Sequence, residues 1–307
     1  MKLDFTGRVA IVTGAGGGLG RAHALALAAR GARVLVNDLG RAGAVRAAGG
    51  PAPAAQAVAD EIVAAGGQAL ANSASVTDVA GVAAMVAQVI DAWGRVDILV
   101  NNAGILRDKS FAKMNLDDFR LVIEVHLMGA VHCSQAVWPV MQAQKYGRIV
   151  MTTSSSGLYG NFGQANYSAA KMALVGLMQT LAIEGAKSDI RVNCLAPTAA
   201  TRMTEGLLGA DLLTALQPEA VVPALLWLAS QDAPTRAIAC AGAGTFEAAH
   251  ITLTPGLHLG VGPDTPEQLA AAWARVSARE DEQAPASGAA QGHNELRLAL
   301  AARASAR

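Results

Sequence analysis

Short apolar runs alternate with longer amphipathic stretches along most of the chain. The short runs cover residues 9–13, 34–37, 69–72, 98–101, 149–153 and 190–195 and are apolar almost throughout, as buried parallel strands are. Helices are expected between them, at roughly 18–30, 54–65, 78–93, 117–144 and 165–186. This alternation predicts an α/β fold, a doubly wound parallel sheet of the Rossmann type with right-handed crossovers.

Two regions break the alternation. Residues 40–53 are rich in Gly, Ala and Pro and are expected to form a loop. Towards the C-terminus, residues 266–277 can form a helix, whereas residues 280–293 are charged, contain Gly and Pro, and are expected to be mobile. We therefore expect one domain over residues 1–262, which binds a dinucleotide and includes the catalytic site. Residues 263–307 are expected to form an appendage, one helix followed by a mobile tail.

Composition narrows the class of protein. Lys plus Arg and Asp plus Glu both number 24, so the formal net charge is zero and no basic field favours a nucleic-acid partner. Cys133, Cys194 and Cys240 lie far apart and fit neither a disulfide framework nor a zinc site, so we expect no metal. No signal peptide and no apolar run of ~18 residues is visible. We expect a cytoplasmic protein that does not bind membranes.

A glycine-rich segment, Thr13-Gly-Ala-Gly-Gly-Gly-Leu-Gly20, joins the first predicted strand to the first predicted helix. Glycine permits a tight turn and a close approach of the backbone to a pyrophosphate, and the helix that follows presents free N–H groups to the anion. The spacing differs from the general Gly-x-Gly-x-x-Gly fingerprint, although Gly16 gives a partial match to it. An ordinary turn is the alternative. The predicted phosphate contacts are Gly14, Gly18, Leu19 and Gly20.

Asp38 ends the second predicted strand. A carboxylate at this place can accept hydrogen bonds from both hydroxyls of the adenosine ribose and repels a 2′-phosphate, so NAD is the predicted cofactor. An Asp here can also simply start a turn. Arg41 and Arg46 follow closely and leave NADP open.

Tyr167 and Lys171 lie four residues apart at the start of a predicted helix, so they share one of its faces. A phenol is a poor base near neutral pH, but a nearby ammonium favours its ionised form. The pair can therefore act as a general base in alcohol oxidation and as the acid in the reverse direction. Taken alone, this spacing also fits a helix without a catalytic role, in which the Tyr is packed and the Lys is solvated. Ser154 follows a predicted strand and can donate a hydrogen bond to a substrate oxygen.

Residues that end the fourth predicted strand, Asn101 to Gly104, are suited to line a cofactor cleft, because ligands of open α/β sheets bind at the carboxyl ends of the strands. Taken together, the motifs resemble those of the short-chain dehydrogenases/reductases over roughly residues 6–246. The residues that carry this resemblance, in order, are Thr13–Gly20, Asn101–Gly104, Ser154 and Tyr167-x-x-x-Lys171.

A narrower resemblance is also visible. Several segments are similar to the dehydrogenase part of the peroxisomal multifunctional enzymes of type 2, also called 17β-hydroxysteroid dehydrogenases of type 4. They are Val36–Gly40, Asn102–Asp108, Lys145–Ile149, Tyr159–Lys171, Leu181–Gly185 and Ala196–Thr204. This resemblance implies oxidation of a (3R)-3-hydroxyacyl-CoA with NAD, and some members act on 17β-hydroxysteroids. It also implies a homodimer or homotetramer.

The resemblance assigns roles residue by residue. Ser154, Tyr167 and Lys171 are implied to be catalytic, and the candidate cofactor contacts beyond those already named are Ser75, Val76, Asn102, Ala103, Gly104, Tyr167, Lys171, Pro197, Ala199, Ala200, Thr201 and Arg202. Many family members have an Asn that holds a water of the proton relay where this chain has His126. We interpret His126 as a relay partner or as a histidine packed in the core. Ala74 stands where this branch commonly has Asp, which removes one polar contact to adenine.

The sequence therefore predicts an NAD-dependent oxidoreductase that acts on a small molecule. The first alternative is the same chemistry on a steroid alcohol or ketone. A basic patch at the mouth of the site would favour acyl-CoA, and a closed apolar pocket would favour a steroid. The second alternative is a cofactor-binding regulator that has lost catalysis. Loss of Ser154, Tyr167 or Lys171 would support it, and all are present.

Overall fold

The computed structural model describes residues 3–40, 52–199 and 215–305. The chain divides into two compact units, Met1–Ala248 and Ala249–Arg307. No helix in the described ranges is both long enough and apolar enough to cross a membrane.

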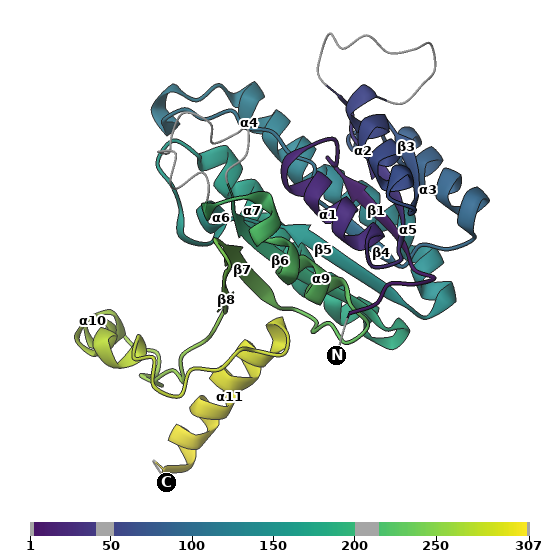
Figure 1. Ribbon diagram of the computed structural model, residues 1–307. Coiled ribbons are helices and arrows are strands. Elements are labelled where there is room, and N and C mark those ends of the chain that lie inside the picture. Colours follow the sequence, from purple (N-terminus) through teal and green to yellow (C-terminus); the bar gives the residue numbers. More distant parts are fainter. Residues whose placement is uncertain (1–2, 41–51, 200–214, 306–307) are drawn as a thin grey trace. The chain divides into compact units, whose positions relative to one another are not determined.

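An eight-stranded sheet forms the centre of the first unit, in the order β3-β2-β1-β4-β5-β6-β7-β8 (Figure 1). The pairings from β3 through to β7 are parallel. The order reverses between β1 and β4, which is where open α/β sheets bind their ligands. The strands are β1 (Val9–Thr13), β2 (Arg33–Asn37), β3 (Gln68–Asn72), β4 (Ile98–Asn101), β5 (Gly147–Thr152), β6 (Ile190–Thr198), β7 (Ile238–Gly242) and β8 (Thr245–Ala249).

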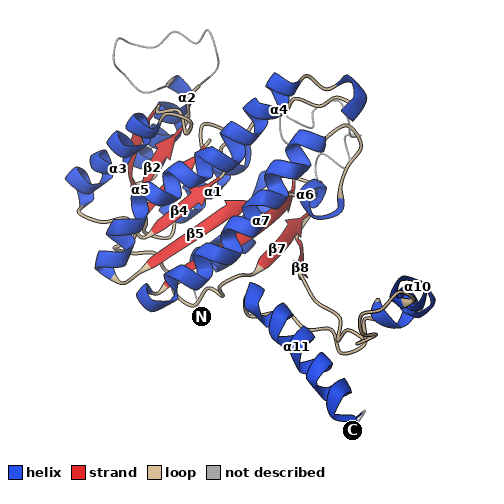
Figure 2. Cartoon of the chain, turned by 180° about the vertical axis from the view of Figure 1, so that it is seen from behind, coloured by secondary structure: helices blue, strands red, loops and turns tan. Residues whose placement is uncertain are grey.

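Helices cover both faces of this sheet, with α1 and α9 on one face (Figure 1) and α5 and α7 on the other (Figure 2). On the first face, Val12, Val34 and Val100 of the central strands pack with Leu27 and Leu225 in a fully buried core. The helices of this unit are α1 (Gly18–Ala28), α2 (Pro53–Ala64), α3 (Val79–Trp93), α4 (Leu116–Ile123), α5 (Gly129–Gln144), α6 (Ser155–Tyr159), α7 (Ala165–Gly185) and α9 (Val222–Ala229). The predicted doubly wound α/β fold is confirmed.

The predicted helix over residues 117–144 is interrupted. Between α4 and α5 the chain forms a π-helical turn, Glu124–Met128, in which the helix continues with one extra residue. His126 lies in this turn and is buried. Hydrophobic periodicity does not show such a turn, because the apolar positions on either side still read as one helix.

The amino ends of the strands are held by a buried cation. Arg148, near the start of β5, is fully buried, and its guanidinium donates to backbone carbonyl oxygens and to the Asp189 carboxylate, 3.0 Å away. The Tyr146 ring lies between Arg148 and Arg8, whose guanidinium carbons are 4.1 Å and 3.8 Å from its centroid. This cluster lies at the edge of the sheet opposite the carboxyl ends of the strands.

The second unit contains α10 (Thr265–Val276) and α11 (Gly288–Ser305). The helix expected over 266–277 is present as α10, but a second helix begins where a mobile tail was expected. Residues 294–305 consist largely of Leu, Ala, Glu and Arg, which favour helix. This unit also begins earlier than residue 263, because Leu253 pairs with Gln283 and the Thr254 hydroxyl donates to the Val276 carbonyl.

Candidate active site

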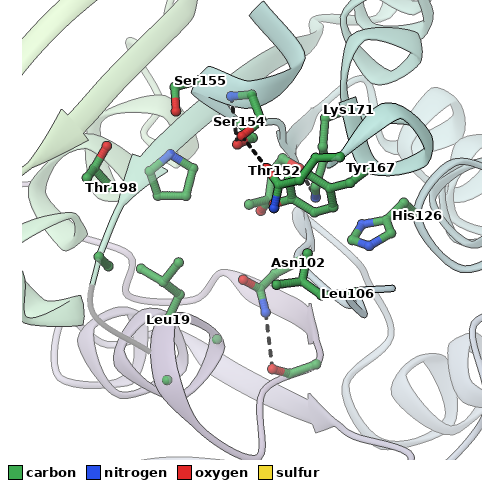
Figure 3. Close-up of a pocket in the computed structure, with 18 of the residues that line it drawn as sticks. Leu19, Asn102, Leu106, His126, Thr152, Ser154, Ser155, Tyr167, Lys171 and Thr198 are labelled. Carbon is green, nitrogen blue, oxygen red and sulfur yellow. Dashed lines mark hydrogen bonds between the residues drawn. The ribbon is translucent and has the colours of Figure 1, made fainter. Parts of the chain in front are cut away.

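A cleft of about 480 Å³ opens at the carboxyl ends of the strands on both sides of the point where the strand order reverses. Ser154, Tyr167 and Lys171 lie together on one side of it, and Leu19 and Asn102 lie on the other (Figure 3). The sequence-predicted residues that line it are Gly14, Gly18, Leu19, Gly20, Asp38, Asn102, Gly104, His126, Ser154, Tyr167, Lys171, Pro197 and Ala199.

The remaining predicted residues do not line this cleft or lie outside the described ranges. The Ser75 hydroxyl is 2.8 Å from that of Thr77, and the Val76 carbonyl is 3.0 Å from Nδ1 of His132. Ala103 acts through its backbone N–H, which donates to the Thr13 hydroxyl. Ala200, Thr201 and Arg202 lie outside the described residues.

The glycine loop fits a pyrophosphate. Gly14 has a φ of +61°, and a Cβ there would lie 2.8 Å from the Cα of Ala103. A Cβ at Gly20 would collide with the carbonyl oxygen of Gly14. No side chain caps the amino end of α1, so its N–H groups stay open towards the cleft. The loop therefore needs glycine at these positions to keep its shape.

Asn102 braces this loop from the neighbouring strand. Its side-chain amide donates to the carbonyl oxygens of Thr13, at 2.9 Å, and Gly14, at 3.1 Å. Its backbone N–H donates to the Thr13 hydroxyl. Asn102 and Ala103 thus hold β1 and the loop in place from β4.

Asp38 faces the same loop. Its carboxylate accepts hydrogen bonds from the backbone N–H groups of Gly16, at 2.9 Å, and Gly40, at 2.8 Å. A Cβ at Gly16 would lie 2.8 Å from this carboxylate. Because an ionised carboxylate has several acceptor positions, its oxygens can still accept from ribose hydroxyls. The uncapped helix, the crowded glycines and this carboxylate together fit a dinucleotide.

Burial dominates the electrostatics of the proton-transfer pair. Burial raises the pKa of Tyr167, a hydrogen bond with Ser154 lowers it, and the negative charge of Asp108 raises it, with a net upward shift. Lys171 is buried, which lowers its pKa to about 7. Its ammonium donates to the Thr152 carbonyl at 2.5 Å and lies 5.5 Å from the centre of the Tyr167 ring.

His126 lies against this pair. Its ring meets that of Tyr167 edge to face, with the centroids 5.3 Å apart. Its Nε2 is 2.8 Å from the Ile105 carbonyl and 3.0 Å from the Ile105 N–H, so either tautomer can bind this backbone. Burial, then the charge of Lys171, lower its pKa to about 3, so the ring is neutral. Within the described residues, Nδ1 has no hydrogen-bond partner.

Further polar residues of the cleft were not predicted from the sequence. They include Asp108, Ser156, Asn161 and Gln164, which form a hydrogen-bonded network at its mouth. Asp108 and Gln164 belong to segments that carry the family resemblance, but neither their spacing nor their residue types indicate that they meet. Over residues 3–40, 52–199 and 215–305, no group of three or more His, Cys, Asp or Glu side chains is placed to hold a metal ion.

Comparison with known proteins identifies the family. A family model described as short chain dehydrogenase matches residues 8–209. The chain belongs to the short-chain dehydrogenases. It is an oxidoreductase of this family, which generally uses NAD or NADP. The alternative of a regulator without catalysis is not supported.

A peroxisomal multifunctional enzyme type 2 of Drosophila melanogaster is 53% identical over 231 residues, which cover 75% of this chain and 38% of the relative. A short chain dehydrogenase from Mycobacterium avium has a TM-score of 0.78 at 39% identity, covering 89% of this chain and 95% of the other. A 7α-hydroxysteroid dehydrogenase complexed with NADH and 7-oxo glycochenodeoxycholic acid has a TM-score of 0.70 at 32% identity. The match covers 78% of this chain and 95% of the other.

The resemblance to the dehydrogenase part of the type 2 multifunctional enzymes is confirmed. The chain spans between 31% and 38% of the length of the first curated relatives that it matches. Those relatives are named peroxisomal, and the cytoplasmic location expected for this chain stays a prediction.

Proposed function

We propose that this chain oxidises the hydroxyl of a (3R)-3-hydroxyacyl-CoA to a ketone with NAD. The observation that carries the proposal is the grouping of Ser154, Tyr167 and Lys171 in one cleft with the glycine loop and Asp38. The relationship to the dehydrogenase part of the type 2 multifunctional enzymes supports the substrate class.

Different residues of the cleft would bind different parts of NAD. The glycine loop and the amino end of α1 would hold the pyrophosphate, and Asp38 would hold the adenosine ribose. Lys171 would reach the nicotinamide ribose, and the stretch from Pro197 to Arg202 would lie along the nicotinamide. Ser75 and Val76 would border the adenine. When bound, the nicotinamide supplies the acceptor for hydride.

Proton transfer falls to Tyr167. The hydroxyls of Ser154 and Tyr167 would both hold the substrate oxygen, and Tyr167 would take its proton. Since burial raises the pKa of Tyr167, ionisation of the phenol needs positive charge nearby, which the Lys171 ammonium and the oxidised nicotinamide can provide. In ketone reduction the same raised pKa suits the phenol as the proton donor.

His126 is proposed as a relay partner behind Tyr167 and Lys171. Its neutral ring, and an Nδ1 with no hydrogen-bond partner among the described residues, support this role. His126→Asn would restore the residue common in the family and should retain turnover, whereas His126→Phe should lose it. Equal turnover in both variants would favour simple core packing.

Two exposed lysines in the segment that follows Asp108 support acyl-CoA as the substrate. Leu106 and Asp108 line the cleft, and Arg107, Lys109 and Lys113 lie on the same exposed segment. Arg107 pairs with Asp118 at 3.5 Å, so Lys109 and Lys113 are proposed to attract the CoA phosphates. Changing both lysines to Glu should raise KM for the CoA thioester and leave KM unchanged for a pantetheine thioester that lacks these phosphates.

A steroid alcohol is the second candidate, supported by the 32% identity to a hydroxysteroid dehydrogenase structure. The deciding experiment is a substrate panel with NAD, in which medium- and long-chain (3R)-hydroxyacyl-CoA are compared with estradiol and testosterone by the absorbance of reduced nicotinamide. Turnover of steroids alone would reject the acyl-CoA assignment. Light scattering on the same preparation tests the proposed homodimer or homotetramer.

Tyr167→Phe is the matched control for this panel. Its turnover should fall roughly 10²–10⁴-fold, because a positioned proton-transfer group contributes about that much. NADH binding should stay nearly unchanged, because the ring keeps its packing. A variant that retained more than about a tenth of the wild-type kcat would remove Tyr167 from this role.

A further inference from the structure

The loop after β4 is fastened to the start of α7 in an antiparallel series of hydrogen bonds. The Asn166 side-chain amide donates to the Arg107 carbonyl at 3.0 Å, the Gln164 amide donates to the Asp108 carboxylate at 2.8 Å, and the Lys109 N–H donates to the Gly163 carbonyl at 2.9 Å. These segments are far apart in the sequence. The series therefore ties the cofactor side of the cleft to the helix that carries Tyr167.

Gln164 stands at the centre of this contact with a fixed amide orientation. Its Nε2 faces the Asp108 carboxylate, which only accepts hydrogen bonds when ionised. Its Oε1 accepts from the Ser156 hydroxyl at 2.8 Å and from the Asn161 amide at 3.0 Å. Rotating the amide by half a turn would point its oxygen at the carboxylate, which cannot donate a hydrogen bond when ionised. Asp108 therefore fixes which end of the Gln164 amide faces it, and the amide oxygen is left for Ser156 and Asn161.

The network continues to the proton-transfer residues. The Ser156 N–H donates to the Ser154 hydroxyl oxygen at 3.2 Å, and Ser154 in turn hydrogen-bonds Tyr167. On the other side, Asn166 accepts from the Tyr167 N–H at 2.7 Å. Both residues that would hold the substrate oxygen are thus connected to Gln164 through a single serine or a short stretch of α7.

We propose that Asp108 and Gln164 form a clamp that positions Ser154 and Tyr167 for proton transfer. The clamp rests on the proposed function, since it presumes that Tyr167 moves the proton. Asp108 and Gln164 touch neither the reacting atoms nor the nicotinamide in this proposal, and both act through Ser156 and α7.

Asp108 also acts on Tyr167 by its charge. Among the described residues, Lys171 of α7 and His126 of the π-helical turn lie against the Tyr167 ring, and the charge of Asp108, in the loop after β4, acts on its phenol. His126 is neutral, and within the described part of the chain the negative charge of Asp108 opposes ionisation of the phenol. Removing that charge should lower the pKa of Tyr167, and the rising limb of the kcat profile for alcohol oxidation should move to lower pH.

The test uses the full chain and separates charge from tether. Asp108→Asn keeps an acceptor for Gln164 and removes the charge, so the pH limb should shift while KM and NADH affinity stay the same. Gln164→Ala breaks the network, so kcat should fall about ten-fold, as expected when a positioned hydrogen bond to a charged group is lost. Asp118→Asn, which removes an exposed charge paired with Arg107, is the matched control. It should change neither the pH of the rising limb nor kcat.

A second readout does not need turnover. The protein has three tyrosines, and the ultraviolet difference spectrum between each background and its Tyr167→Phe counterpart follows ionisation of Tyr167 alone. Asp108→Asn should move this titration to lower pH. A panel without turnover, combined with this shift, would count against the proposed substrate and not against the clamp. A wild-type kcat in Gln164→Ala would overturn the clamp. An unmoved titration in Asp108→Asn would overturn the separate effect of the Asp108 charge on Tyr167.

Discussion

Replacing Lys171 by Met should stabilise the folded protein while it abolishes turnover. The Lys171 side chain is buried, and this burial lowers its pKa from 10.5 to about 7. An unfolded chain keeps the proton up to about pH 10.5, whereas the folded chain keeps it only up to about pH 7. The unfolded state therefore binds more protons between these values, and the free energy of unfolding rises with pH across this window.

The size of the effect follows from the shift. At about 1.4 kcal/mol per pKa unit, charging Lys171 costs the folded state roughly 5 kcal/mol below pH 7, and this cost disappears above pH 10.5. Met removes the cost and also the hydrogen bond to the Thr152 carbonyl, which costs roughly 1–3 kcal/mol when a buried acceptor is left unpaired. The net gain on the acid side is roughly 2–4 kcal/mol, or about 3–8 °C in Tm for a chain of this length.

Urea unfolding of the cofactor-free protein at a series of pH values measures this directly. The stability difference between Lys171→Met and wild type should be largest below about pH 7 and should shrink towards pH 10.5. Lys187→Met, at an exposed lysine, is the control and should show no such trend. A difference that is constant with pH, or a Lys171→Met protein less stable than wild type at neutral pH, would refute the assignment of a costly buried ammonium.

Other changes test other parts of the molecule. NAD should be preferred over NADP by about ten-fold or more in kcat/KM, which is the effect expected of one charged hydrogen bond. Asp38→Asn should weaken this preference. Equal kcat/KM of the wild type with both cofactors would show that the Asp38 carboxylate does not discriminate between NAD and NADP. Arg148→Met should lower the free energy of unfolding by roughly 3–5 kcal/mol, because it breaks a buried charge network, with NADH affinity of the folded fraction unchanged. Removing residues 249–307, which form a separate compact unit, should leave NADH affinity intact. Loss of NADH binding would contradict the placement of all cofactor contacts in the first unit.

The centre of the sheet was predictable because β1, β2, β4 and β5 are buried on both faces over almost their whole length. Runs such as Ile98–Asn101 contain little but apolar residues, and β1 and β4 have the predicted bounds. β7 was not predicted, since Ile238-Ala-Cys-Ala-Gly242 is made of small residues with no strong strand preference. α11 escaped prediction because its apolar residues do not gather on one face, so neither helical nor extended periodicity marks it.

The site residues that could be predicted from the sequence are those whose chemical role follows from residue type and local position. Local sequence is enough to indicate the roles of three features: glycines next to a strand, a carboxylate at a strand end, and Tyr and Lys one helical turn apart. Local sequence does not reveal the contact between Asp108 and Gln164, because this contact depends on the tertiary packing of the loop after β4 against the start of α7. Likewise, the raised pKa of Tyr167 reflects burial, which no local pattern reveals.

The π-helical turn Glu124–Met128 makes the length of this segment as important as its composition. Each residue turns an α-helix by about 100°, and the turn absorbs one extra residue without rotating α4 against α5. Losing one residue here would make a single regular helix, and either α4 would present a different face to α7 or His126 would leave Ile105. Two chains with the same residues at every aligned site position can therefore differ in this cleft if their lengths differ by one. When relatives are aligned, a gap inside this helix is a change in the active site.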